Sequence, residues 1–198
     1  MLEAGRDVFG QVGYTAATMQ EIARRARVAP QTLYFSFNSK PRLLRAVMDF
    51  VSTGGLEYKA VPDRDWYREA ANASTPRRVL ELLVDGGTGI AERIGPLSQA
   101  IAEAAALEPE IAQRRQELTA GRLRGVRHLV HHITELGGLA LGLVEAEATD
   151  VIYILSAPET YRRFNERGWT VDRWKRWLLD ELSNVVLKPH ASGRRRQG

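Results

Sequence analysis

Apolar residues recur three and four positions apart along nearly the whole chain, and this spacing limits the possible folds more than any other feature. It places apolar side chains on one face of an α-helix, whereas a half-buried strand requires strict alternation, which few segments show. Glycine and proline interrupt the pattern at intervals of helix length. The sequence therefore predicts an all-α fold built from several packed helices.

The interruptions also predict where the helices begin and end. Four short helices are expected over about 1–12, from Thr18, from Pro30, and from Ser39 to Thr53. The glycine pair and the polar stretch between 54 and 76 predict an irregular connector. Beyond the connector, helices are expected over about 77–94, 96–107, 109–136, 145–156 and 171–187, with a turn or short helix through Tyr161.

Charge is distributed unevenly along the chain. Residues 1–52 carry seven Lys and Arg against four Asp and Glu, and residues 188–198 carry four basic residues and no acidic one. Residues 53–187 hold 17 basic and 20 acidic residues, so the middle of the chain is slightly acidic. A basic head on a nearly neutral body is typical of a protein that contacts phosphates at one end.

Composition excludes several classes of protein. The chain has no cysteine, so disulfides and thiolate chemistry are excluded. It has neither an apolar stretch long enough to span a membrane nor the layout of a secretion signal at its start, so we expect a soluble, cytoplasmic protein. Nucleotide-binding glycine loops, serine-hydrolase elbows and metalloprotease motifs are also absent from the sequence, so we expect neither an enzyme nor a cofactor.

A helix-turn-helix is predicted between Thr18 and Phe37. Thr18 and Glu21 form a capping box, in which the hydroxyl accepts from an amide of the first turn and Glu21 reaches back to the cap. Pro30 suits the first position of the next helix, on which Leu33 and Phe37 face inward. An ordinary helical hairpin is the alternative. The side chains expected to face outward are Gln31, Thr32 and Tyr34.

The residues in and around this segment form a pattern at fixed spacing: Gly13, Tyr14, Thr18, Met19, Ile22, Ala23, Ala26, Val28, Thr32, Leu33, Tyr34, Phe37, Lys40 and Leu43. This pattern resembles the signature of the TetR (tetracycline-repressor-like) family of transcriptional regulators. Segments 155–161, 167–169 and 174–177 also resemble the C-terminal part of many members. Between about 55 and 145 the chain is compatible with the family only in helix count.

The resemblance implies three regions and a function. Residues 1–53 would form a three-helix DNA-binding domain, residues 54–190 a helical ligand-binding and dimerisation domain, and residues 191–198 a basic, disordered tail. The expected function is a sequence-specific regulator that binds double-stranded operator DNA as a C2 homodimer. Most simply it is a repressor released by a small, mostly apolar ligand. A helical interaction module, a ligand-independent regulator and an enzyme without a known motif are the alternatives.

Three positions depart from the family pattern. Arg27 stands where the family usually has a turn glycine, and a left-handed backbone there would cost about 1 kcal/mol. Ala29 replaces the usual Ser or Thr cap of the recognition helix, which loses about 1 kcal/mol of capping. Ser36 replaces a common His or Tyr, so one phosphate contact is expected to be weaker or absent.

The resemblance also implies DNA-binding roles for individual residues. The candidates for phosphate contact, together with the amides at helix N-termini, are Thr18, Thr32, Tyr34 and Lys40, with Arg27 as an added cation. Gln31 is the only long polar side chain on the reading face and is the candidate for a base-edge contact, for instance with adenine. Candidates for thymine methyl contact are Ala29, Pro30 and Phe35, with core packing as the alternative for Phe35.

Two further sets of residues are expected in the body. By resemblance, a dimer would pair the helices 109–136 and 171–187 through Gly121, Gly125, Trp174, Trp177, Leu178, Leu182 and Val185, although both stripes could also face the chain's own core. The candidates for a ligand pocket are Leu83, Gly86, Gly87, Ile90, Leu97, Ile101, Leu129 and Ile133, and the two glycines should weaken or bend their helix.

Three histidines stand on one helical face at positions 128, 131 and 132. Two of them have the spacing of zinc ligands, but no cysteine exists and no carboxylate stands beside them at ligand spacing. We expect a solvated or interface cluster and no metal.

Overall fold

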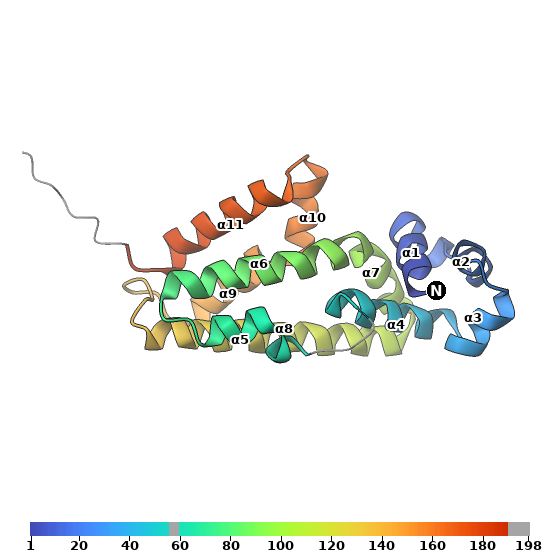
Figure 1. Ribbon diagram of the computed structural model, residues 1–198, viewed down its shortest axis with the longest axis horizontal. Coiled ribbons are helices and arrows are strands. Elements are labelled where there is room, and N and C mark those ends of the chain that lie inside the picture. The colour runs from blue at the N-terminus through green and yellow to red at the C-terminus, as the bar shows by residue number, and fades with distance from the viewer. Residues whose placement is uncertain (56–59, 190–198) are drawn as a thin grey trace, which may run out of the picture.

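The computed structural model describes residues 1–55 and 60–189 and shows an elongated all-α fold (Figure 1). At one end, the head contains α1 (Leu2–Ala16), α2 (Met19–Ala26), α3 (Pro30–Phe37) and α4 (Lys40–Thr53). The body contains α5 (Asp65–Ala71), α6 (Pro76–Ile94), α7 (Ser98–Leu107), α8 (Pro109–Glu135), α9 (Glu145–Leu155), α10 (Pro158–Glu166) and α11 (Val171–Val186), with short 3-10 turns at Val61–Asp63 and Gly95–Leu97. The predicted all-α class is confirmed, and the tail 191–198 lies outside the described residues.

Side-chain caps begin the helices that the sequence placed best. The hydroxyls of Thr18, Ser39, Thr75 and Thr170 each accept a hydrogen bond from an amide in the first turn of α2, α4, α6 and α11. Such a cap satisfies one of the amides that a helix start leaves without a partner. These four starts are therefore local properties of the sequence.

The head core is completed by the body. Leu33, Leu43 and Leu44 are fully buried there, and five residues of the body join the same cluster: Leu97, Ala100, Ile101, Ala104 and Ile111. Since α7 packs against both α1 and α8, the head is joined to the body by continuous apolar packing. The packing is therefore continuous across the expected boundary near residue 53.

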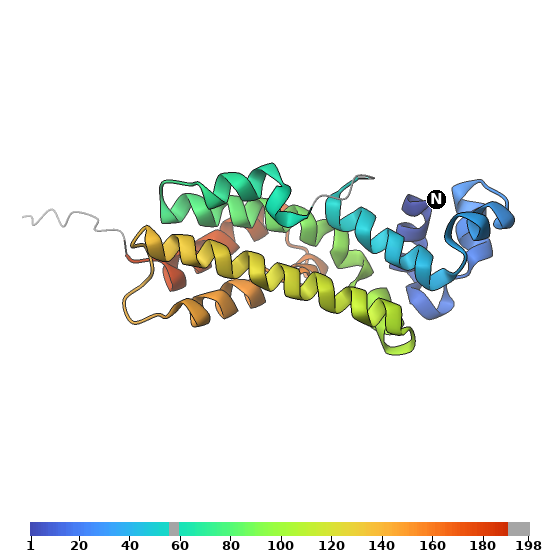
Figure 2. The same cartoon turned by 90° about the horizontal axis from the view of Figure 1, so that it is seen from below.

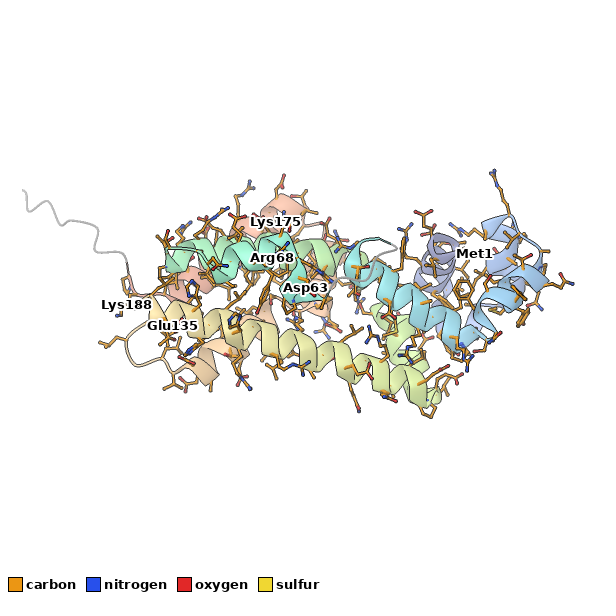
Figure 3. All side chains as sticks on the ribbon, turned by 60° about the horizontal axis from the view of Figure 1, so that its bottom comes forward. Met1, Asp63, Arg68, Glu135, Lys175 and Lys188 are labelled. Atoms are coloured by element: carbon orange, nitrogen blue, oxygen red, sulfur yellow. The ribbon has the colours of Figure 1, made fainter. Side chains whose placement is uncertain are left out.

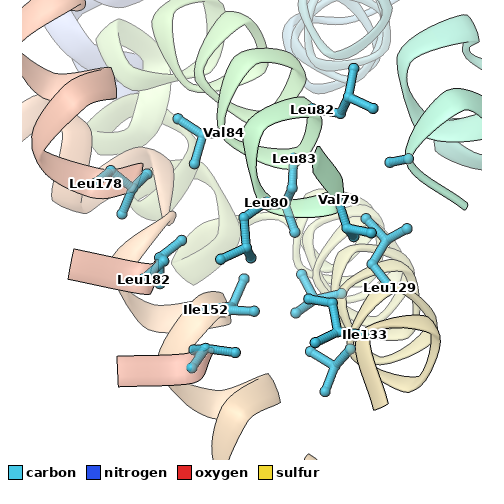
Figure 4. Packing of buried hydrophobic residues seen from close by; sticks show 14 of the residues in the cluster. Val79, Leu80, Leu82, Leu83, Val84, Leu129, Ile133, Ile152, Leu178 and Leu182 are labelled. Carbon is cyan, nitrogen blue, oxygen red and sulfur yellow. The ribbon is translucent and has the colours of Figure 1, made fainter. Parts of the chain in front are cut away.

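The body packs around α6, which contacts α5, α8, α10 and α11. In Figure 4, Leu178 and Leu182 of α11 and Ile152 of α9 lie around Leu80 of α6. On the other side of α6, α8 runs along the length of the body (Figure 2). None of the helices in residues 1–55 and 60–189 combines the length and apolar content that a membrane span requires.

Two elements differ from the sequence prediction. The connector contains α5, a short helix whose Tyr67 and Ala70 are buried against the body. The first helix continues beyond Gly13 to Ala16 after a kink at Gly13, where φ is 78° and ψ is 178°. Glycine adopts this conformation readily, whereas other residues rarely do. Gly13 therefore interrupts the helix without ending it.

The glycine pair in α6 was expected to weaken or bend that helix, but α6 runs without interruption from Pro76 to Ile94. A Cβ on Gly86 would lie only 2.1 Å from the ring of Trp66, so Gly86 makes room for an indole from α5. A Cβ on Gly87 would meet no heavy atom within 4 Å. Close packing by Trp66 thus explains one glycine, and nothing in the structure explains the other.

Candidate nucleic-acid interface

The turn between α2 and α3 has helix-turn-helix geometry. The Thr18 hydroxyl accepts from the Glu21 amide at 3.1 Å, and Met19, Ile22 and Ala23 are buried beneath α2. Arg27 follows α2 in the left-handed conformation, with φ 56° and ψ 41°. The expectation of a left-handed residue at this position is therefore confirmed. The cost of about 1 kcal/mol falls on an arginine whose side chain is exposed to solvent.

The second half of the expected capping box does not form. The Glu21 carboxylate instead accepts two hydrogen bonds from Arg24, at 2.6 and 2.8 Å. This contact with the guanidinium holds the pKa of Glu21 below its usual value. A bidentate, charge-assisted pair is stronger than one bond to a backbone amide, so Arg24 takes the carboxylate away from the cap.

The outer face of α3 is presented to solvent. Leu33 is fully buried and anchors the helix, whereas Phe35 is 91% exposed and Tyr34 is 43% exposed. The core-packing alternative for Phe35 is therefore wrong. Ala29 offers no side-chain cap and Pro30 occupies the first turn. The other residues exposed along this face are Gln31, Thr32 and Ser36, whose hydroxyl donates to the Thr32 carbonyl at 2.9 Å.

Lys40 begins α4 three residues after the end of α3. Its ammonium donates to the carbonyls of Tyr14 and Ala17, at 3.0 and 3.1 Å, and lies 4.3 Å from the centre of the Tyr14 ring. One of its three donors remains for a phosphate. The phosphate-contact candidates Thr18 and Lys40 thus lie beside one another, because Ala17 directly precedes Thr18.

Most of the predicted dimer residues face the chain's own core. Trp174, Leu178 and Leu182 are at most 1% exposed, so the prediction that they meet a partner is wrong. Gly125 is also buried, with its Cβ position 3.5 Å from the Tyr67 ring, and Trp177 packs on Phe164 with ring centres 4.7 Å apart. A stripe of apolar residues on a helix is the same in sequence whether it meets its own chain or another. The remaining members of the set are Gly121, which is half-buried, and Val185, which is 43% exposed.

The predicted pocket residues do not line one cavity. Leu83, Leu129 and Ile133 belong to the body core, whereas Leu97 and Ile101 belong to the head core. All five are at most 8% exposed. The remaining three are half-buried along α6: Gly86, Gly87 and Ile90.

Two hollows instead lie where the head meets the body. One of about 690 Å³ is lined by α1, α4 and α6, and includes Phe50, Val51, Arg93 and Pro96. Another of about 520 Å³ is lined by α1, α7 and α10 with the turn between α6 and α7, and includes Gln11 and Tyr161. Apolar periodicity could not reveal these hollows, because polar side chains from several helices line them.

The histidines of α8 are engaged with neighbouring helices and loops. His128 Nδ1 and the Tyr67 hydroxyl are 2.9 Å apart, and His132 Nε2 lies 2.9 Å from the Ala73 carbonyl. His131 Nδ1 is 3.2 Å from Glu145 at the start of α9. Their contacts are structural, between α8 and its neighbours.

The fold and the head together define a helix-turn-helix protein of the kind that places a short recognition helix in the DNA major groove. Residues 1–47 match the family model described as bacterial regulatory proteins, tetR family. This match confirms the resemblance of the head to the N-terminal domain of that family, and solved structures of such regulators have a similar fold.

Three relatives illustrate the similarity. Over 88 residues the chain is 35% identical to the A-factor receptor protein of Streptomyces griseus, a segment that covers 44% of this chain and about a quarter (26%) of that protein. The fold is similar to the TetR family regulator PfmR from Thermus thermophilus, with TM-score 0.67, 18% identity and coverage of 93% and 97% of the two chains. It is also similar to FadR from Bacillus subtilis in complex with stearoyl-CoA, with TM-score 0.64, 18% identity and coverage of 92% and 95%.

Proposed function

We propose that this protein is a sequence-specific DNA-binding repressor that a small molecule releases from its operator. The observation that carries the proposal is the outward face of α3, where Phe35 is 91% exposed beside Gln31, Thr32 and Tyr34. A large aromatic side chain so exposed is costly in water, and contact with thymine methyls would cover it. The phosphate-contact candidates Thr18 and Lys40 lie beside one another at the starts of α2 and α4, the helices that contact α3.

The first experiment measures binding to duplex DNA between low and moderate salt. Phosphate contacts release counterions, so the affinity should fall steeply as salt rises. Lys40→Ala and Tyr34→Ala should weaken binding to all sequences about equally, and Lys40→Ala, which removes a cation, should also reduce the salt slope by about 1. A flat salt profile for the wild-type protein would exclude phosphate-driven binding and favour a helical interaction module.

Gln31→Ala tests base reading. Selection of bound sequences from random DNA should give a preferred operator, and this variant should relax preference at one base position by about 1–3 kcal/mol. Phe35→Ala should relax preference at a thymine. Equal losses on every sequence would contradict a base-reading role for either side chain. Repression itself is tested with a reporter that carries the selected operator within a promoter.

We propose that the protein is a C2 homodimer whose interface keeps Val185 from the sequence prediction and adds apolar side chains of α9 and the loop before it. Four apolar side chains of α9, α11 and the loop before α9 are exposed by 43% to 97%: Leu141, Val144, Ile154 and Val185. The loop between Glu135 and α9 and the end of α11 near Lys188 lie together at the end of the body away from Met1 (Figure 3). The bridge between Leu139 and Leu187 fastens these two segments to each other.

Ile154→Arg tests this interface, with Leu107→Arg as its matched control. The two side chains are equally exposed, at 61% and 62%, but Leu107 ends α7 near the head. Sedimentation should give twice the 22.2 kDa chain mass for the wild type and the control, and a lower mass for Ile154→Arg. A wild-type monomer at micromolar concentration would remove both the dimer and the expectation of a palindromic operator.

Ligand dependence is supported by the hollow at the junction of head and body. Its volume of about 690 Å³ suits a small molecule, and a ligand there would contact α1, α4 and α6 at once. The apolar part of a ligand would meet Phe50, Val51 and Pro96. A hundredfold loss of operator affinity needs about 2.7 kcal/mol of coupling, and operator DNA must weaken ligand binding by the same factor.

The test is a thermal-shift screen of hydrophobic compounds, followed by titration of each hit into the protein–operator complex. A stabilising compound that releases DNA would support ligand-dependent repression. Compounds that stabilise the protein but leave operator affinity unchanged would favour a ligand-independent regulator.

A further inference from the structure

Tyr14 is held by polar contacts from the body. The Glu103 carboxylate of α7 accepts from the amides of Tyr14 and Thr15, at 2.9 and 3.3 Å. The Tyr14 hydroxyl donates to Glu108 at 2.8 Å, and Glu108 is the residue between α7 and α8. Tyr14 is 2% exposed, so these contacts are made inside the junction of head and body.

On its other side, Tyr14 holds Lys40. The Tyr14 carbonyl accepts from the Lys40 ammonium at 3.0 Å, and the Tyr14 ring lies under the same ammonium. Lys40 also donates to the Ala17 carbonyl, which directly precedes the cap of α2. A chain of direct contacts therefore runs from α7 to the start of α4. It consists of Glu103, Glu108, Tyr14 and Lys40, and we call it the Tyr14 relay.

The backbone of α1 kinks at Gly13, where it makes room for the Glu103 carboxylate. The kink at Gly13 turns the next two amides toward Glu103, and a Cβ on Gly13 would lie 2.8 Å from a Glu103 carboxylate oxygen. Only glycine combines the left-handed φ with the space that the carboxylate occupies. The kink and the carboxylate therefore depend on one another.

Among the described residues, polar contacts farther along α4 also join the body to the head. Arg114 of α8 pairs with Asp49, at 2.5 Å, and Arg93 of α6 donates to the Val51 carbonyl at 2.8 Å. Asp49 is nine residues after Lys40 in α4, which is roughly 14 Å along the helix. The Tyr14 relay, in contrast, reaches the start of α4.

We propose that Glu103 and Glu108 are positioning residues for DNA binding: by fixing Tyr14 they hold Lys40 and the start of α2 where these meet phosphates. A displacement of α7 is then transmitted to the head through the same contacts. The inference rests on the proposed DNA-binding function. It assigns to two acidic residues a favourable effect on binding to a polyanion, which their charge alone would oppose.

The test compares full-length Glu103→Ala, Glu103→Gln and Tyr14→Phe with Glu110→Gln. Glu110 is a neighbouring carboxylate on the first turn of α8, so its variant matches the change in charge. Affinity for duplex DNA and its salt slope are measured well below the melting temperature of each variant. Glu103→Ala should bind roughly 2- to 30-fold more weakly, a range expected for residues that couple two sites.

The salt slope separates positioning from general destabilisation. Glu103→Ala should reduce the slope by about 1, as expected when one phosphate contact is lost. Glu103→Gln should recover part of the affinity, because an amide oxygen can still accept from the two backbone amides. Tyr14→Phe should show a smaller loss, since it keeps the ring beneath Lys40. Glu110→Gln should bind at least as well as the wild type.

A double variant tests whether Glu103 acts through Lys40. If it does, Glu103→Ala should cost little further affinity in a Lys40→Ala background, because both changes remove the same contact. Fully additive losses, or an unchanged slope and affinity for Glu103→Ala, would overturn the relay. A wild-type protein that binds no duplex at low salt would overturn the DNA-binding function instead.

Amide hydrogen exchange distinguishes a failure of the Tyr14 relay from a failure of the proposed DNA-binding function. Exchange in Glu103→Ala should be faster at Tyr14 and Thr15 and in the first turn of α2, whether or not DNA binds. Unchanged exchange in the first turn of α2 would overturn the positioning role.

Discussion

Replacing Gly13 by alanine should destabilise the protein through two effects that act together. Gly13 has φ 78° and ψ 178°, a region of backbone conformation that is essentially restricted to glycine. Holding alanine there costs about 1–3 kcal/mol. The new Cβ would also lie 2.8 Å from one Glu103 carboxylate oxygen and 3.0 Å from the other. The carboxylate must then move away from the amides of Tyr14 and Thr15.

The strain alone predicts a measurable change. For a chain of this length, 1 kcal/mol corresponds to about 2–4 °C in melting temperature, so Gly13→Ala should melt about 2–12 °C below the wild type. Thermal unfolding is followed by circular dichroism at one protein concentration, because a dimer's melting temperature depends on concentration. The lost carboxylate contacts add to this shift.

Gly10→Ala is the matched control. It lies in the same helix, and its Cβ would be 3.5 Å from the Pro96 carbonyl oxygen, an ordinary contact distance. Because alanine favours a helix over glycine by up to about 1 kcal/mol, this variant should melt at or above the wild-type temperature. A Gly13→Ala protein within about 2 °C of the wild type would refute both the strain and the displacement of the carboxylate.

Three further predictions follow from backbone, packing and charge. Arg27→Gly should raise the free energy of unfolding by up to about 1 kcal/mol, because it relieves a left-handed arginine, and it should lower the salt slope of DNA binding. Unfolding and binding titrations measure the two effects, and a loss of stability would contradict the left-handed conformation of Arg27. Gly86→Ala should cost about 1–3 kcal/mol by pushing Trp66 from its place, whereas Gly87→Ala should be neutral or stabilising, and equal melting temperatures for the two would show that Trp66 moves freely. The amides of Thr15 and Tyr14 and the side chain of Gln99 hold the pKa of Glu103 below its ordinary value of 4.5. The stability that the ionised Glu103 carboxylate contributes is thus complete above pH 4.5 and is lost as the pH falls through the lowered pKa. The gap in melting temperature between wild type and Glu103→Gln should therefore shrink on acidification, and a constant gap would exclude this linkage.

Elements whose signals are local could be predicted from the amino-acid order. Thr18 caps the helix that it was expected to cap, and Ser39 and Thr170 cap helices that begin where the sequence placed them, because a hydroxyl and an amide three residues apart meet without help from the rest of the chain. The helix-turn-helix was predictable for the same reason, since its caps, turn and anchoring Leu33 lie within 20 residues. The left-handed state of Arg27 also follows from the tight turn.

The surface that each apolar stripe meets depends instead on the packing of distant helices. Trp174, Leu178 and Leu182 form a stripe that suits a partner as well as a core, and the packing of α11 against α6, α9 and α10 makes them internal. Leu97 and Ile101 come after α6 in the sequence of the body, but they complete the core of the head because α7 packs against α1. Hydrophobic burial has no direction of its own, so periodicity predicts that a face is buried without identifying its neighbour.

The Tyr14 relay is the clearest case of a feature that the sequence could not reveal. Tyr14 and Glu103 are 89 residues apart, and neither has a neighbour in sequence that signals the contact. The sequence placed Gly13 at a break in a helix, and that much was local. That the break admits a carboxylate from α7, and through it joins the body to Lys40, depends on the packing of α7 against α1.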